Sequence, residues 1–536
     1  MIQNEINRFG SACFAEPHEI AQAGLYKQTP DALFVGFDEN NKPMWYRKPG
    51  GALIEGGARG GKLATVLGYN LCHGVLSGET IVALDMKGEL AAISQNQTPD
   101  NKACIYWNPC GLHGLPQHRI NPLDHLTANS TSLIADIKVL CENMIVPSKG
   151  TNSGYFTGRA REFLEGIAVT RTKLDGVLTF PALYAAINLI PTNNDEWLVF
   201  AEEMHFSGYP LSKRIEEEIA AARASSGDGG GFQGILGELF RAFSTFSDPT
   251  LMEAVSPPYD FSFADLCNGS QLYQVYLMPP AEYVEAWSSG LKAMFVAGML
   301  NKSRAQQAPR QTWILDECAQ LGAFPLVTKL FTYGAGIGIR PVAVFQSAEQ
   351  MRAIGPDAKE IITSSAALRM VFAVREITSA QALANTLGVQ TLEWDDEQSQ
   401  ARARFAKQQA VQSMMMGGDP MEAALSMRHH KQMAQQQSKQ QRLLRTPDEI
   451  LNMPDDKMFV FVDGVPAPIY ATRKPYWEQR FMAGRYHPNP YHPPLDSVRV
   501  KTLFGHKTCS VITERVPARF AHLPQYRSGS WSYIRT

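Results

Sequence analysis

Short apolar runs that end in polar residues recur along this sequence. Five of them lie at residues 81–84, 312–315, 340–345, 368–374 and 459–462. The second run leads into Asp316 and Glu317, and the third leads into Gln346. Runs of this length and composition are typical of strands buried in a parallel sheet, where ligands bind at the carboxyl ends of the strands. The pattern therefore predicts an α/β fold with its candidate chemistry after these strands.

Residues from about 155 to 248 follow a different pattern. Their apolar positions recur with the period of an α-helix, as in GRAREFLEGIAVTR and SKRIEEEIAAARAS, and strand-like runs are few. We interpret residues 151–250 as an all-helical domain inserted into the α/β core. The glycine-rich run at 225–231 (SSGDGGG) has no lysine after it, so it is interpreted as a flexible connection between helices and not as a phosphate loop.

Residues 397–441 differ in composition from the rest of the chain. They are rich in Gln, Met, Ala and basic residues and poor in β-branched and aromatic ones, which favours an exposed helix pair or a partly disordered segment. The methionines could form an interaction face. His429 and His430 could suggest a metal site, but no carboxylate or cysteine ligand pattern surrounds them, so a solvated face is favoured.

Residues 476–536 form a basic, aromatic C-terminal extension. Its basic residues outnumber Asp496 and Glu514, and three aromatic residues are interleaved with them. These residues are Arg499, Lys501, Lys507, Arg515, Arg519, Arg527 and Arg535, with Tyr526, Trp531 and Tyr533. Such a segment could contact phosphates and stack on bases, or it could simply pack over the domain. Both interpretations stay open.

Length and composition limit the number of domains and the class of protein. The 536 residues suit about two to four domains. We predict a nucleotide-binding core split between residues 1–150 and 251–475, with the helical domain between the two parts and the extension after them. No apolar stretch approaches the roughly 18 to 20 residues of a membrane-spanning helix, and the polar start lacks the features of a signal peptide. We therefore expect a cytoplasmic protein. The net charge of −2 argues against a uniformly basic nucleic-acid protein.

The eight cysteines include no C-x-x-C pair. Neither a zinc ribbon nor a disulfide framework is indicated. We expect reduced, mostly buried thiols, because free cysteine behaves as a small buried hydrophobe.

A glycine-rich stretch matches the phosphate-loop pattern G-x-x-x-x-G-K. Its candidate nucleotide-binding residues are Gly56, Gly57, Ala58, Arg59, Gly60, Gly61, Lys62 and Leu63. Closely spaced glycines let backbone N–H groups turn toward a phosphate, the following helix adds its positive end, and Lys62 reaches the outer phosphates. Leu63 stands where the pattern has a hydroxyl for Mg²⁺, and Thr65 is a weak substitute.

The acidic pair Asp316-Glu317 supplies what an NTP hydrolase needs besides its phosphate loop. One carboxylate holds Mg²⁺, usually through water, and the next polarises the attacking water. An acidic pair after an apolar run is commonly just a strand end that meets solvent. Here the loop, the acidic pair and the strand ending at Gln346 come in the order of a RecA-like core, and agreement between independent features favours a hydrolase.

Several further motifs make the chain resemble the coupling proteins of type IV secretion and conjugative DNA transfer, which are hexameric RecA-like ATPases. The resemblance spans roughly residues 10 to 475 and rests on the order and spacing of the motifs. Besides the phosphate loop they are GSACFAEPHEI, LDMKGEL (84–90), INPLD (120–124), YFTGRAREFLEG (155–166), ILDECAQLGAFP (314–325), AVFQSAEQM (343–351), ITSSAALRMVFAVREITSAQALANTLG (362–388) and RTPDEILNMP (445–454).

The resemblance assigns roles to individual residues. It implies that Lys62 binds phosphate, that Asp316 serves Mg²⁺, that Glu317 is the catalytic carboxylate and that Gln346 senses the γ-phosphate. Arg369 is implied as the arginine finger that reaches a neighbouring subunit, because an arginine stays charged and stabilises charge on phosphoryl oxygens. Two rivals for the finger are Arg340 and Arg375.

The resemblance also implies partners. ATP and Mg²⁺ would bind between the subunits of a homo-hexamer. The helical domain would recognise substrates, which are relaxase–DNA complexes or protein effectors, and the ring would act with the channel ATPases and inner-membrane components of the secretion system. Members of the family usually carry membrane helices before the core, and this chain resembles the soluble variants, so we expect it to reach the inner face of the inner membrane through partners.

Two alternatives remain at this stage. Because of Leu63, the chain could be a non-hydrolysing adaptor that keeps the fold and uses its surfaces for docking. It could also be a DNA translocase unrelated to secretion, which would share the core chemistry and bind DNA directly.

Overall fold

The computed structural model of the chain describes residues 10–147, 153–192, 194–224, 230–394 and 438–536, with the single residues 405, 408, 409 and 412 between the last two ranges. The chain divides into two units. The larger unit contains Pro17–Phe372, Asp455–Gly464 and Tyr470–Thr536, and the smaller contains Met1–Glu16, Ala373–Pro454 and Val465–Ile469.

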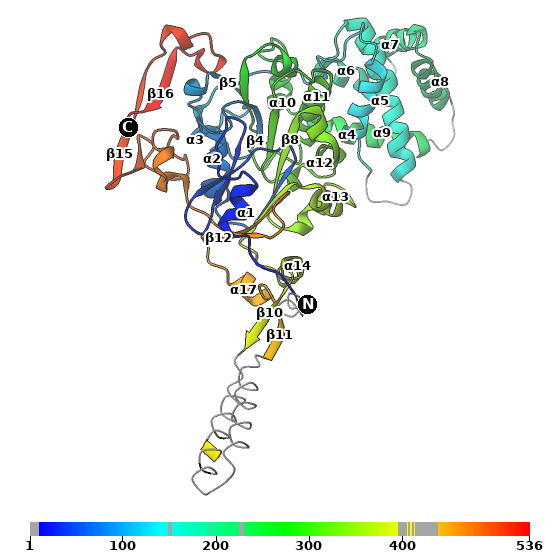
Figure 1. Ribbon diagram of the computed structural model, residues 1–536. Helices are drawn as coiled ribbons and strands as arrows, with labels where there is room; N and C mark the ends of the chain where they lie inside the picture. The colour runs from blue at the N-terminus through cyan, green and yellow to red at the C-terminus, as the bar shows by residue number, and fades with distance from the viewer. Residues whose placement is uncertain are drawn as a thin grey trace. The chain divides into compact units, whose positions relative to one another are not determined.

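A mixed sheet, with eleven strands among the described residues, forms the centre of the larger unit (Figure 1). Its order is β2-β1-β13-β12-β9-β3-β8-β7-β4-β6-β5. The strands are β1 (Leu33–Phe37), β2 (Pro43–Tyr46), β3 (Ala52–Gly56), β4 (Thr80–Leu84), β5 (Lys102–Trp107), β6 (Leu272–Leu277), β7 (Gln311–Leu315), β8 (Ile339–Phe345), β9 (Leu368–Phe372), β12 (Lys457–Val462) and β13 (Ile469–Thr472). The seven strands from β9 to β5 are mutually parallel.

The parallel strands are apolar because both of their faces are covered. Every residue of β3, β4, β7 and β8 is buried, as expected for strands between layers of helices. Covering helices of the core include α11 (Ser288–Arg304), α12 (Pro325–Ile337) and α13 (Ala358–Ser365). The five apolar runs predicted as strands are β4, β7, β8, β9 and β12, and the predicted α/β fold is confirmed.

A helical bundle interrupts the sheet between β5 and β6, which are nevertheless paired (Figure 1). Its helices are α4 (Leu133–Met144), α5 (Ser153–Asp175), α6 (Phe180–Leu189), α7 (Asp195–Phe206), α8 (Pro210–Ala224), α9 (Gly230–Phe243) and α10 (Pro249–Ala254). Side-chain caps begin three of them, since Thr179 accepts from the Ala182 N–H, Asn194 from the Trp197 N–H and Asp248 from the Thr250 N–H. Most of the glycine-rich run at 225–231 lies outside the described residues.

The smaller unit contains α14 (Ile377–Leu387), the antiparallel pair β10 (Val389–Trp394) and β11 (Ser438–Leu443), and α17 (Pro447–Leu451). A capping box of Thr446 and Glu449 begins α17. Most of the Met/Gln-rich segment, including His429 and His430, lies outside the described residues, and its last four residues belong to β11.

The C-terminal extension is part of the larger unit and packs against its sheet at β5. Its strands β14 (Ser497–Thr502), β15 (Gly505–Arg515) and β16 (Ser530–Ile534) form a separate small sheet. The side-chain amide of Gln525 accepts from the Cys104 N–H at 2.9 Å and donates to the Lys102 carbonyl at 3.1 Å. It thereby satisfies backbone groups of the edge strand β5 that would otherwise be open to pairing.

Two further expectations concern the whole chain. All eight cysteines are free thiols and five of them are buried, as predicted. Across the parts of the chain that the structure describes, we find no helix with the length and apolar character needed to cross a bilayer.

Candidate nucleotide-binding site

Four neighbouring parallel strands bring the predicted site residues together. The phosphate loop follows β3, Gln346 follows β8, Asp316 and Glu317 follow β7, and Asp85 follows β4. The strands lie in the order β3-β8-β7-β4, with their last residues side by side. The carboxyl ends of the sheet therefore gather a lysine, an amide and three carboxylates that are far apart in the sequence.

Glu317 is the centre of the polar contacts at this edge. Its Oε1 lies 2.7 Å from the Lys62 Nζ, and its Oε2 accepts from the Gln346 Nε2 at 2.8 Å. The backbone of Glu317 has a φ of +50°, an unusual conformation for a residue with a side chain, and such conformations are typical of functional sites. This conformation turns the chain sharply after Asp316 and presents both carboxylates at the end of β7.

Burial changes the acidity of two carboxylates. It raises the pKa of Asp316 to about 6, an effect that the positive charge of Lys62 partly opposes. Burial also raises the pKa of Asp85 to about 7, although Asp85 accepts a hydrogen bond from the Ala91 N–H. Asp85 was not predicted as a site residue, yet it follows a buried strand just as Asp316 does, so the same rule applied to residues 81–84 would have found it.

The phosphate loop has the backbone geometry that its glycines allow. Gly61 has a φ of +76°, and a Cβ on Gly56 would lie 2.5 Å from the Phe372 ring and 2.9 Å from the Lys62 side chain. The loop leads directly into a helix, whose first turn, Leu63–Leu67, has π-helical hydrogen bonds and continues as α2 (Gly68–Leu71). A loop of this kind at a helix N-terminus can accept an anion.

Arg473 directly follows β13, and its side chain supports the phosphate loop. Its guanidinium donates to the Gly60 carbonyl at 2.6 Å and to the Thr65 hydroxyl at 3.2 Å, and it lies 3.9 Å from the centre of the Phe372 ring. Burial lowers the pKa of Arg473 to about 10, against the opposing charges of Asp455 and Asp456. Sequence reasoning missed this residue, because no local motif joins it to a loop more than 400 positions away.

The hydroxyl of Thr65 is already engaged. It donates to the Gly61 carbonyl at 2.9 Å and accepts from Arg473, and the side chain is buried. Leu63, in contrast, lines the cavity beside the loop. The structure therefore argues against Thr65 as a substitute for the hydroxyl that the loop pattern lacks at position 63.

A cavity of about 890 Å³ lies against these residues. The loop from Ala58 to Ala64 forms one part of its wall, and Asp85, Asp316, Glu317 and Gln346 form another. Residues of the C-terminal extension, from Tyr476 to Arg499, complete the lining. The sequence pattern of the extension leaves its ligand open and does not connect it with the phosphate loop.

The three candidate arginine fingers have different surroundings. Arg369 forms a two-pronged contact with Glu55, whose carboxylate oxygens lie 3.2 and 3.0 Å from the arginine nitrogens. Arg375 is exposed and belongs to the smaller unit.

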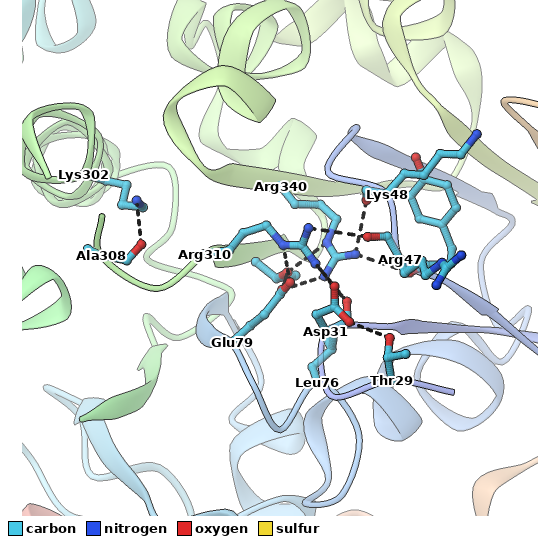
Figure 2. A network of polar contacts seen from close by, with 12 residues as sticks. Thr29, Asp31, Arg47, Lys48, Leu76, Glu79, Lys302, Ala308, Arg310 and Arg340 are labelled. Atoms are coloured by element: carbon cyan, nitrogen blue, oxygen red, sulfur yellow. Dashed lines mark hydrogen bonds and ion pairs between the residues drawn. The ribbon is translucent and has the colours of Figure 1, made fainter. Parts of the chain in front are cut away.

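Arg340 is fully buried near the amino end of β8, at the opposite ends of the strands from the phosphate loop, and Figure 2 shows its polar contacts. Its guanidinium lies 2.6 Å from Glu79 and donates to the Asp31 carbonyl at 2.9 Å, while Arg310 contacts the same two residues. A side chain held in this way cannot extend to another subunit, which removes Arg340 as a candidate finger. Arg369 and Arg375 remain.

The fold and the arrangement of the loop and strand-end carboxylates define the class of RecA-like P-loop NTPases. A model of the family described as type IV secretory system conjugative DNA transfer matches residues 3–494, and the chain belongs to this family.

Individual relatives agree with this assignment. The conjugal transfer protein TraG of Escherichia coli is 22% identical over 89% of this chain and 77% of its own length. The plasmid coupling protein TrwB, solved with ADP and Mg²⁺, has a TM-score of 0.59 at 14% identity, covering 86% of this chain and 93% of TrwB. An unbound form, TrwBdeltaN70, has a TM-score of 0.60 at 15% identity, covering 87% of this chain and 95% of the TrwBdeltaN70 chain. The predicted RecA-like core with an inserted helical domain is thereby confirmed.

Proposed function

We propose that the chain is an ATP-dependent coupling protein that recruits DNA–protein or protein substrates to a type IV secretion channel and drives their transfer. Membership of the conjugative DNA transfer family supports the general role. The observation that carries the proposed activity is the contact of Glu317 with both Lys62 and Gln346 at the end of the parallel strands. Two residues from two other segments converge there on the carboxylate of Glu317, beside a cavity large enough for a nucleotide.

The residues of the cavity fit a magnesium–nucleotide complex. Mg²⁺ is usually held by one or two carboxylates together with substrate phosphates, and Asp316 and Asp85 offer such oxygens at the edge of the cavity. Bound Mg²⁺ would neutralise charge on the phosphoryl oxygens. Lys62 would bind the outer phosphates and exchange its contact with Glu317 for one with phosphate. Glu317 would then be available to orient and deprotonate the attacking water, with Gln346 holding the carboxylate in place.

The assembly is a further part of the proposal. ATP would bind between the subunits of a homo-hexamer, and Arg369 or Arg375 of one subunit would reach the nucleotide of the next. Arg369 would have to leave Glu55 to do so. The helical bundle would recognise relaxase–DNA or protein cargo, and partners in the channel would hold the ring at the cytoplasmic face of the inner membrane.

Magnesium-dependent ATP hydrolysis by the purified chain tests this function. Turnover should disappear in Glu317→Gln while nucleotide binding remains, and single-stranded DNA should stimulate turnover if the cargo is nucleic acid. Equal turnover in the wild type and in Glu317→Gln would contradict the assignment of Glu317 to the catalytic site.

The non-hydrolysing adaptor remains a second candidate because of one observation. Leu63 takes the place of the hydroxyl that commonly holds Mg²⁺, and the Thr65 hydroxyl is engaged elsewhere. Nucleotide binding without turnover in the wild-type chain, under conditions in which the ring forms, would favour the adaptor. Substituting Leu63→Ser should then raise Mg²⁺-dependent turnover. If turnover does not rise, the missing hydroxyl is not the reason for the absence of hydrolysis.

A further inference from the structure

The C-terminal segment Tyr476–Arg499 is fixed against the phosphate-loop helix of its own chain. The Tyr476 ring packs so closely on Gly68 that a Cβ there would lie 2.7 Å from it. Next to it, the Tyr69 hydroxyl donates to the Lys474 carbonyl at 2.9 Å, and the His487 N–H donates to the Ile93 carbonyl at 2.8 Å. These contacts make the segment a wall of the cavity and not a loose tail.

The two parts of the cavity wall differ in chemistry. Around the loop the lining is charged, with Lys62, Asp85, Asp316 and Glu317. The aromatic side chains of the lining come from the C-terminal segment. Ligand sites commonly combine apolar or aromatic surface with a few fixed polar groups, so this cavity has one end suited to phosphates and another suited to a flat ring.

Trp477 is the large aromatic residue of this wall that is only half-buried while lining the cavity. Tyr476 and Tyr486 are buried and pack against each other with ring centres 4.8 Å apart, and Trp477 meets the Tyr476 ring in a T-shaped contact with ring centres 4.9 Å apart. Every nucleobase has a flat face that can stack on an aromatic side chain. Trp477 therefore offers a stacking surface within the same cavity as the phosphate loop.

Arg499 is held beside this surface by a short polar chain. His506 accepts from the Arg499 guanidinium at its Nδ1 (3.0 Å), and its Nε2 donates to Glu478 (2.8 Å), which follows Trp477 in the sequence. A single neutral tautomer of His506 satisfies both contacts. The cation at Arg499 is thus oriented by the neighbour of the tryptophan.

Resting on the proposed nucleotide-binding function, we propose that the C-terminal segment is the base-binding subsite of its own chain, with Trp477 stacking on the base of a nucleoside triphosphate and Arg499 contacting its base or ribose. The phosphates bind on the loop at Lys62, and the segment supplies affinity for the nucleoside. The role of this part of the extension is then recognition of the nucleotide and not of nucleic acid. Stacking accepts any base, so the subsite raises affinity for nucleosides in general.

Two ligands separate the subsite from the phosphate loop. Adenosine 5′-(β,γ-imido)triphosphate carries base, ribose and phosphates, whereas inorganic tripolyphosphate carries phosphates alone. Calorimetric affinities of the full chain are measured for both in Mg²⁺, in the wild type, Trp477→Ala, Trp477→Phe and Arg499→Ala. Trp531→Ala is the matched control, because this half-buried tryptophan of the same extension lies outside the phosphate-loop cavity.

The expected result is selective. Trp477→Ala should weaken binding of the imidotriphosphate about tenfold, which corresponds to the usual contribution of base stacking, and leave tripolyphosphate unchanged. Trp477→Phe should restore most of the affinity, Arg499→Ala should give a smaller selective loss, and Trp531→Ala should change neither ligand. An equal loss for both ligands, or no loss in Trp477→Ala, overturns the subsite. If the wild type binds neither ligand, the proposed nucleotide binding itself has failed.

Discussion

Neighbouring parallel strands of the sheet carry a polar cluster at each end, and the two clusters differ in how completely they are enclosed. At the amino ends of β4, β7 and β8, Glu79 is enclosed by Arg310 and Arg340 (Figure 2). At the carboxyl ends, Glu317 contacts Lys62 and Gln346 beside a cavity. Each cluster is built around a glutamate paired with a cation.

The difference lies in how completely each carboxylate is satisfied. Glu79 is 1% exposed and accepts from two guanidinium groups and from the Thr312 hydroxyl, so both of its oxygens are engaged inside the protein. Glu317 has a single lysine and an amide, and its side chain is 20% exposed. A closed network of this kind serves stability, whereas a partly open pair can exchange partners with a ligand. Residue types alone do not distinguish the two.

The cluster of Glu317, Lys62 and Gln346 is called the open end. The largest expected effect is on ATP turnover at this open end. Replacing Glu317 by Gln should lower ATP hydrolysis by about a hundredfold to ten-thousandfold, because a positioned general base commonly contributes that much. Single-turnover hydrolysis measures the loss, and retained binding of labelled nucleotide shows that the site is intact. Lys27→Ala, at an exposed lysine outside the site, is a control for general damage and should leave turnover unchanged. A loss of less than tenfold in Glu317→Gln would remove Glu317 as the base.

The cluster of Glu79, Arg310 and Arg340 is called the closed end. Substitutions at this closed end should lower the stability of the fold. Replacing Arg340 by Ala leaves Glu79 buried with one guanidinium in place of two, and breaking a buried pair costs about 3 to 5 kcal/mol in the free energy of unfolding. We expect a value near the lower limit, because Arg310 keeps its contact with Glu79. Denaturant unfolding measures the change.

A matched substitution at the open end sharpens the contrast. Lys62→Ala should change the free energy of unfolding by less than about 1 kcal/mol, because the remaining carboxylate of Glu317 is partly exposed to water. If Lys62→Ala destabilises the chain as strongly as Arg340→Ala does, the two ends do not differ in the way described.

Glu79→Gln combined with Arg340→Met should recover part of the stability that Arg340→Ala loses, since no uncompensated charge remains.

The open end should also lower stability at neutral pH. Burial raises the pKa of Asp85 to about 7 and that of Asp316 to about 6, above the usual value for aspartate in an unfolded chain. The folded state therefore binds these protons more tightly than the unfolded state does. Their contribution to stability is fully present below about pH 4 and is lost as the pH rises through 6 to 7.

Asp85→Asn tests this directly. At pH 8 the variant should be more stable than the wild type by about 1 to 3 kcal/mol, and the difference should shrink toward pH 4. Thermal unfolding at several pH values measures it, with the exposed Asp357→Asn as control. A variant that is less stable than the wild type at pH 8 would show that the extra strength of the hydrogen bond from the Ala91 N–H to a charged Asp85 outweighs the cost of burying the charge.

The contrast between the two ends also explains what the sequence can predict. The strands were predictable because buried parallel strands are continuous apolar runs, and the gathering of Lys62, Asp316 and Gln346 at one edge of the sheet was predictable because they follow such runs or a glycine-rich loop. Arg340 was misplaced among the candidate fingers, because the sequence shows an arginine at the start of an apolar run but not the Glu79 that pairs with it. That pairing depends on strand order.

Residues that act over long sequence distances were beyond pattern reasoning. Arg473 contacts Gly60 only because β13 and the phosphate loop are brought together in the folded chain. The wall formed by Trp477 and its neighbours depends in the same way on where the extension turns back onto the core. No periodicity or motif encodes such an approach, whereas composition correctly marked the extension as unusual.

A modest effect on ligand affinity is expected at Arg473, which contacts the phosphate loop. Replacing Arg473 by Met keeps an apolar stem against Phe372 but removes the donors to the Gly60 carbonyl and the Thr65 hydroxyl. Gly60 belongs to the loop that would hold the phosphates, so affinity for tripolyphosphate should fall about tenfold, equivalent to about 1.4 kcal/mol. Because Arg473 acts through the loop and not on the nucleoside, the imidotriphosphate should lose affinity by the same factor. This equal loss is opposite to the selective loss expected for Trp477→Ala, so measuring the two variants side by side separates support of the loop from recognition of the base. If Arg473→Met instead leaves both affinities unchanged, the loop keeps its shape without this arginine, and the helix after it is sufficient.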